Sequence, residues 1–63
     1  MDINALRVAI RMVLNGMRPA ELERRFGFTH GFAVRLVKKV RELELTSDGL
    51  DRLTNEALEA LYY

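Results

Sequence analysis

The apolar residues at the start of the chain recur at helical spacing. Successive members lie alternately three and four residues apart, which places them on one face of an α-helix. Asp2 is a suitable N-cap before them, and Gly16 suits the left-handed conformation that often ends a helix. We therefore predict a helix over about 2–16. Its core-facing residues are Ile3, Leu6, Ile10, Val13 and Met17.

Two further helices are predicted before residue 44. Pro19 suits the first turn of a helix, where its missing N–H costs nothing, and Gly27 ends that helix at about 19–26. Thr29 is a suitable N-cap for a third helix over about 30–43. One side of the third helix is an apolar arc made of Phe32, Ala33, Leu36, Val37, Val40 and Leu43. The opposite side is basic and consists of Gly31, Arg35, Lys38 and Lys39.

The remaining residues fit two structures. In the first, Thr46 or Ser47 caps a fourth helix over about 47–62. Its apolar face would consist of Leu50, Leu53, Ala57, Leu58, Ala60 and Leu61. In the second, a small wing hairpin over about 43–54 turns at Asp48-Gly49, and only the last residues are helical. The helical periodicity covers more residues, so we predict an all-α fold, with a three-helix core and a C-terminal helix that packs on it or forms a dimer contact.

Length and composition argue against catalysis. The chain has 63 residues, no cysteine and one histidine, His30. Thiolate metal sites are therefore excluded, and the sequence contains no nucleophile–histidine pair or glycine-rich phosphate loop. We expect no enzyme activity, no metal and no cofactor. Chains this short are marginally stable alone, so we expect a single domain over 1–63 that gains stability as a homodimer.

Charge divides the chain into two parts. Residues 1–41 hold nine Lys/Arg against three acids, and residues 42–63 hold one Arg against six acids. This asymmetry indicates a basic functional face and a separate acidic element, although two solvated surfaces of opposite sign would give the same pattern. The sequence shows no signal peptide and no apolar run near the ~20 residues of a membrane span, so we expect a soluble, cytoplasmic protein.

Residues 16–33 (GMRPAELERRFGFTHGFA) resemble the helix-turn-helix of small phage, plasmid and bacterial DNA-binding regulators. The turn glycine of that motif matches Gly27, and the apolar residues beside it match Phe26 and Phe28. Buried positions of its two helices match Leu22, Ala33 and Leu36. One position departs from the pattern, because Glu23 stands where a small residue usually packs between the helices, so its side chain must extend outward or the packing must be looser there.

The resemblance implies sequence-specific binding to double-stranded DNA, with the second helix of the motif in the major groove. It places Thr29, His30, Gly31, Val34, Arg35 and Lys38 toward the groove. Phosphate contacts would come from Lys38, Lys39, Arg24, Arg25 and Arg18. Arg35 would bind a guanine, and a homodimer would bind a palindromic site as a transcriptional repressor or regulator.

A second hypothesis assigns the same fold to protein binding. Ala5, Val8 and Met12 lie opposite the core stripe of the first helix, and Phe32 and Val34 add apolar character near the groove-facing residues. A phage-like adaptor or anti-activator that inhibits a host regulatory protein would use such a surface. Residues predicted to contact a partner or a second copy are Val8, Met12, Phe32, Leu50, Leu53, Leu58, Leu61 and Tyr62.

Overall fold

The computed structural model describes residues 2–62, and this part of the chain contains five α-helices joined by short turns. They are α1 (Ile3–Leu14), α2 (Pro19–Phe26), α3 (His30–Glu42), α4 (Ser47–Arg52) and α5 (Asn55–Tyr62). The predicted all-α fold class is therefore confirmed for these residues. None of the helices combines the length and apolar character needed to cross a membrane.

The first three helices begin and end within two residues of the predicted positions. The Asp2 carboxylate accepts a hydrogen bond from the Asn4 amide at 3.1 Å, which satisfies one of the free N–H groups at the start of α1. Thr29 caps α3 in the same way, its hydroxyl accepting from the Phe32 amide at 3.2 Å. Gly27 ends α2 in the left-handed conformation, with φ of +70°.

The last part of the chain differs from both predicted structures. A continuous helix over 47–62 is wrong, because Leu53 is extended and separates α4 from α5. The hairpin over 43–54 is also wrong, since residues 2–62 contain no strand. Two threonine hydroxyls account for two short helices. Thr46 accepts from the Gly49 amide at 3.0 Å and begins α4, and Thr54 accepts from the Ala57 amide at 3.1 Å and begins α5.

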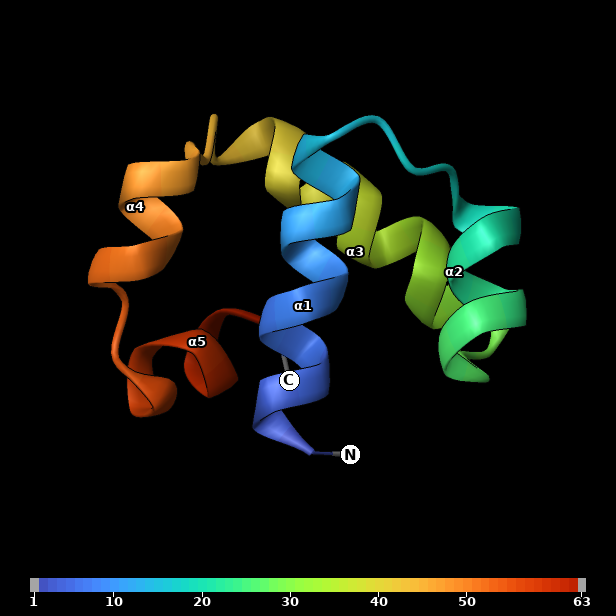
Figure 1. Cartoon of the computed structure of the whole chain (residues 1–63), viewed down its shortest axis with the longest axis horizontal. Coiled ribbons are helices and arrows are strands. Elements are labelled where there is room, and N and C mark those ends of the chain that lie inside the picture. The colour runs from blue at the N-terminus through green and yellow to red at the C-terminus, as the bar shows by residue number, and fades with distance from the viewer. Residues whose placement is uncertain (1, 63) are drawn as a thin grey trace.

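Helix α1 lies at the centre of the arrangement and packs against each of the other four helices. In Figure 1, α2 lies on one side of α1, α4 and α5 lie on the other, and α3 crosses behind it. The largest fully buried side chains come from α1, α2, α4 and α5, and they are Leu6, Ile10, Leu22, Leu50 and Leu58. Leu43, predicted to face the core, is instead 45% exposed, because α3 ends at Glu42 and Leu43 is its C-cap.

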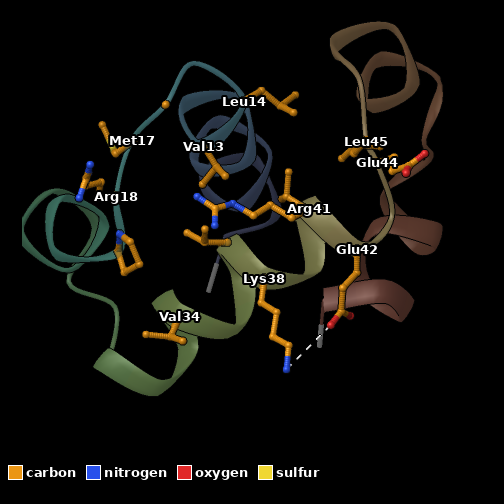
Figure 2. A pocket seen from close by; sticks show the side chains of 14 residues that line it. Val13, Leu14, Met17, Arg18, Val34, Lys38, Arg41, Glu42, Glu44 and Leu45 are labelled. Atoms are coloured by element: carbon orange, nitrogen blue, oxygen red, sulfur yellow. Dashed lines mark ion pairs between the residues drawn. The ribbon is translucent and has the colours of Figure 1, made fainter.

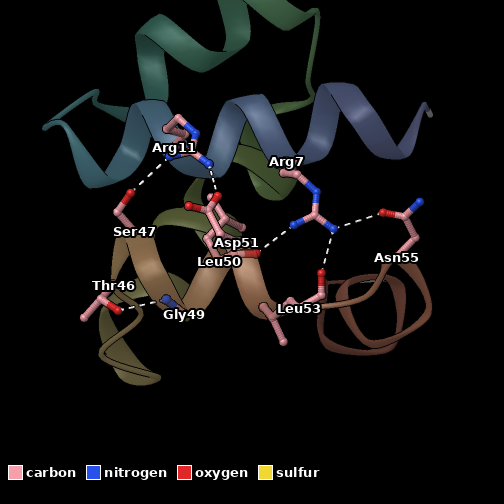
Figure 3. Close-up of polar contacts among 9 residues, drawn as sticks. All are labelled: Arg7, Arg11, Thr46, Ser47, Gly49, Leu50, Asp51, Leu53 and Asn55. Atoms are coloured by element: carbon pink, nitrogen blue, oxygen red, sulfur yellow. Dashed lines mark hydrogen bonds and ion pairs between the residues drawn. The ribbon is translucent and has the colours of Figure 1, made fainter.

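Two arginines of α1 hold the acidic tail against the helix (Figure 3). The Arg7 guanidinium donates to the carbonyl oxygens of Leu50 and Leu53 at 2.7 and 2.9 Å, and to the Asn55 side chain at 3.0 Å. Arg11 donates to the Ser47 hydroxyl at 3.0 Å. It also forms an ion pair with Asp51. Part of the charge asymmetry in the sequence is therefore used inside the molecule, where basic α1 meets acidic α4.

Candidate functional site

The outer face of α3 is the most distinctive surface of the molecule. One side of this helix is fixed in the core by Ala33, Leu36, Val37 and Val40. The opposite side consists of Gly31, Val34, Arg35 and Lys38, all exposed, and we call these four residues the outer face of α3. Because α2 and α1 both pack against α3, this face is held on a rigid support.

Three phenylalanine rings pack together at the start of α3. Phe28 stacks on Phe26 with ring centroids 5.2 Å apart, and it meets the ring of Phe32 edge-on at 4.9 Å. Phe32 is half-buried and packs against the core. It therefore anchors the turn between α2 and α3 and does not stand on the outer face of α3.

His30 and Glu23 form a pair across this turn. The His30 Nδ1 lies 3.1 Å from a Glu23 carboxylate oxygen. The Glu23 side chain is 32% exposed, and the His30 side chain is 78% exposed. Because a carboxylate only accepts hydrogen bonds, Nδ1 carries the proton in this contact. Sequence analysis placed His30 in the site but missed its partner, since the two residues lie on different helices.

Most basic side chains near α3 have no acidic partner. Among residues 2–62, Arg11 pairs with Asp51, His30 contacts Glu23, and Lys38 lies 3.9 Å from Glu42 on the next turn. Within residues 17–41, the exposed cations without an ion pair are Arg18, Arg24, Arg25, Arg35, Lys39 and Arg41. Residues 17–41 hold seven Lys/Arg against two acids, so they carry a formal charge of +5.

A groove of about 940 Å³ runs beside α3. Its floor includes Val13 and Met17, and its basic lining residues are Arg18, Lys38 and Arg41. Figure 2 shows Arg41 extending from α3 across this groove, while Lys38 points away toward Glu42. The sequence did not single out Arg41 as a site residue, because helical periodicity places it between the apolar and basic sides of α3. Its place next to Lys38 on the flank of α3 was the available signal.

The residues predicted to meet a partner lie in different environments. Leu50 and Leu58 are fully buried within the single chain, so their side chains complete its core and are not offered to a partner. Leu53, Leu61 and Tyr62 are half-buried. On α1, Val8 is 46% exposed, and it lines a shallow pocket of about 330 Å³ together with Met12.

Within residues 2–62, no three His, Asp or Glu side chains gather in a way that could hold a metal ion. Burial raises the pKa of the Tyr62 hydroxyl, but this group belongs to the packing of α5 and not to the outer face of α3. The exposed groups of α3 are suited to binding a polyanion through charge and hydrogen bonds.

No protein-family model matches this chain, and no curated protein or solved structure is significantly similar to it. The functional interpretation therefore depends on the geometry and charge of the chain itself.

Proposed function

We propose that this protein binds double-stranded DNA through the outer face of α3 and acts as a transcriptional repressor. The observation that carries the proposal is the set of unpaired cations on and around that face. In this proposal α2 and α3 are the two helices of a helix-turn-helix, and α1 supports them. The left-handed Gly27 between α2 and the Thr29-capped α3 supports this assignment.

The residues divide into two kinds of contact. Arg35 is exposed and unpaired at the centre of α3, where its planar guanidinium would hold the O6 and N7 atoms of a guanine. Thr29, His30 and Gly31 lie at the start of α3, the end that approaches base edges in this mode of docking. Contacts to phosphates would come from Arg18, Arg24, Arg25, Lys38, Lys39 and Arg41, and such contacts position a protein without specifying sequence.

The size of the molecule supports a homodimer as part of this proposal. The Cα trace measures 27 × 21 × 16 Å, so one copy offers a single helix to a single stretch of groove. Two half-sites that lie about 34 Å apart on one face of the duplex require two copies. Val8 and Met12 on α1 are the accessible apolar residues for the contact between them.

The same two residues favour a second candidate function. An exposed valine beside a shallow pocket also suits the side chain of another protein. Under this alternative, the chain is an adaptor that binds and inhibits a host regulatory protein through α1, and it has no need of the cations on α3. The two functions therefore depend on different helices.

A duplex titration separates them. Fluorescently labelled random-sequence duplex is titrated with protein at several salt concentrations between about 50 and 200 mM, because released counterions make phosphate binding weaken steeply with salt. The plot of log K against log salt has a negative slope, and we expect Lys38→Ala to make that slope less negative by about 0.9. Arg52→Ala, which removes an exposed cation from α4, is the matched control and should leave the slope unchanged.

The absence of duplex binding at low salt would reject the DNA-binding proposal. Capture of a regulatory protein from a lysate by the wild type, but not by Val8→Glu, would then support the adaptor alternative. The Val8 side chain is exposed, so this change tests the α1 surface without disturbing the core.

A further inference from the structure

The outer face of α3 contains one apolar side chain among cations. Val34 is 40% exposed, and Arg35 and Lys38 flank it on the same helix face. A valine in this position has no core to fill and costs solvent-exposed apolar surface. Because cationic side chains flank Val34, a polyanion bound at this face would contact the valine as well, and an apolar group of that polyanion would fit against it best.

No side chain at Gly31 blocks close approach of another molecule to Val34. Gly31 lies one turn before Val34, and a Cβ added there would meet no other atom within 4 Å. The glycine therefore leaves open space on the helix surface beside the valine, so a second surface can approach the backbone of α3 closely here. Arg35 and Lys38 are long and flexible, and they can extend past Val34 to polar atoms on either side.

In the major groove of DNA, the C5-methyl group of thymine is the apolar feature among hydrogen-bond donors and acceptors. Guanine and adenine present polar atoms at their groove edges, and a valine placed against those atoms would remove them from water without a replacement hydrogen bond. Unmodified cytosine has a hydrogen at C5 in place of the methyl group, so thymine offers the valine the larger apolar contact.

We propose that Val34 is a specificity-determining residue that selects a thymine in the bound DNA by contact with its C5-methyl group. This inference rests on the proposed function, because it requires α3 to enter the major groove. It assigns Val34 and Arg35 different targets: a thymine methyl for the valine and a neighbouring guanine for the arginine.

The test begins with a duplex selected from a random library by the wild-type protein. We expect an invariant thymine in each half-site, next to the position that depends on Arg35. Replacing that thymine by uracil removes only the methyl group and should weaken binding about fourfold, the effect expected for one methyl group withdrawn from an apolar contact. Placing 5-methylcytosine there, paired with guanine, returns the methyl group and should restore part of the loss.

A cycle of protein and DNA changes assigns the effect to Val34. With Val34→Ala, the ratio of affinities for thymine and uracil duplexes should fall from about four toward one, since the shorter side chain no longer reaches the methyl group. Leu43→Ala truncates a similarly exposed apolar side chain at the end of α3, outside the proposed groove and dimer contacts, and is the matched control, for which the ratio should stay at about four. Both side chains are exposed, so thermal unfolding should be nearly unchanged in both variants.

The possible failures are distinguishable. If no duplex is selected or bound at low salt, the proposed function fails and this inference fails with it. If a duplex is bound but thymine and uracil give equal affinity, the assignment of Val34 is overturned while DNA binding stands. The assignment is equally overturned if Val34→Ala keeps the full preference for thymine.

Discussion

Removal of the Arg7 guanidinium should release the acidic tail from α1. Arg7 is half-buried and donates three hydrogen bonds to groups more than forty residues away, at the end of α4 and the start of α5. Two of the acceptors are the carbonyls of Leu50 and Leu53 at the end of α4, and the Leu50 carbonyl also accepts from the Leu53 amide at 3.2 Å. Arg7→Ala therefore removes the side-chain donor from both carbonyls, and the Leu50 carbonyl keeps its backbone partner.

The size of the effect can be worked from these contacts. Hydrogen bonds that involve a charged group contribute roughly 1.5–3 kcal/mol each, but water will reach the partly exposed carbonyls and return much of that. We therefore expect Arg7→Ala to lower the free energy of unfolding by about 2 kcal/mol in total. A chain of this length has a total stability of about 3–9 kcal/mol. The midpoint of thermal unfolding should fall by about 8–16 °C.

Thermal and urea unfolding followed by circular dichroism at 222 nm measure this change. Arg7→Lys keeps the charge but has no planar fork to reach three acceptors, so it should lose more than half as much stability as Arg7→Ala. Arg11→Ala is the control, because its pair with Asp51 is exposed on both sides and contributes at most about 1 kcal/mol. A loss below about 0.5 kcal/mol for Arg7→Ala, or a larger loss for Arg11→Ala, would refute the assigned role of Arg7.

Three other changes have expected outcomes. Tyr62→Phe should raise stability by about 1 kcal/mol, because the buried hydroxyl has no hydrogen-bond partner among residues 2–62. Burial also raises the pKa of Tyr62 above 10.0, so the wild type should lose stability as the pH rises from 10 through that raised pKa, and urea titrations at several pH values should show a smaller loss in the variant. Gly27→Ala should cost about 1 kcal/mol in the same assay, since φ there is +70°; an unchanged midpoint would contradict the strained-turn argument. Leu43→Gln should change the free energy of unfolding by less than about 0.5 kcal/mol, and a large loss of stability would mean that Leu43 packs in the core.

The first three helices were predictable because each is specified by nearby residues. Asp2, Gly27 and Thr29 act on backbone groups within three or four positions, and the apolar stripes repeat at helical spacing. Local pattern therefore contains most of the information for this part of the fold.

The tail was not predictable in the same way, because its leucines keep helical spacing across the break at Leu53. Two influences end α4 there. The Thr54 hydroxyl caps the start of a new helix. The Arg7 guanidinium donates to the Leu53 carbonyl, which in a continuous helix would accept from a backbone amide of the next turn. The second influence comes from the other end of the chain, and no local periodicity reports it.

The candidate site was predictable in composition but not in its contacts. Exposed cations on one side of α3 follow directly from helical periodicity. The pairing of Glu23 with His30 depends on how α2 and α3 are oriented across the turn, and the contribution of Arg41 depends on the groove beside α3. Both require the packed structure.

The burial of Leu50 and Leu58 determines the smallest piece of this chain that can fold. Both leucines are fully buried, and the helices that carry them, α4 and α5, lie on the other side of α1 from α2 (Figure 1). A fragment ending at Thr46 would keep α1, α2 and α3 but would remove Leu50 and Leu58 from the core cluster that also contains Leu6 and Ile10. Such a truncation should lack a cooperative unfolding transition, so the tail belongs to the folding unit and cannot be treated as a removable appendage.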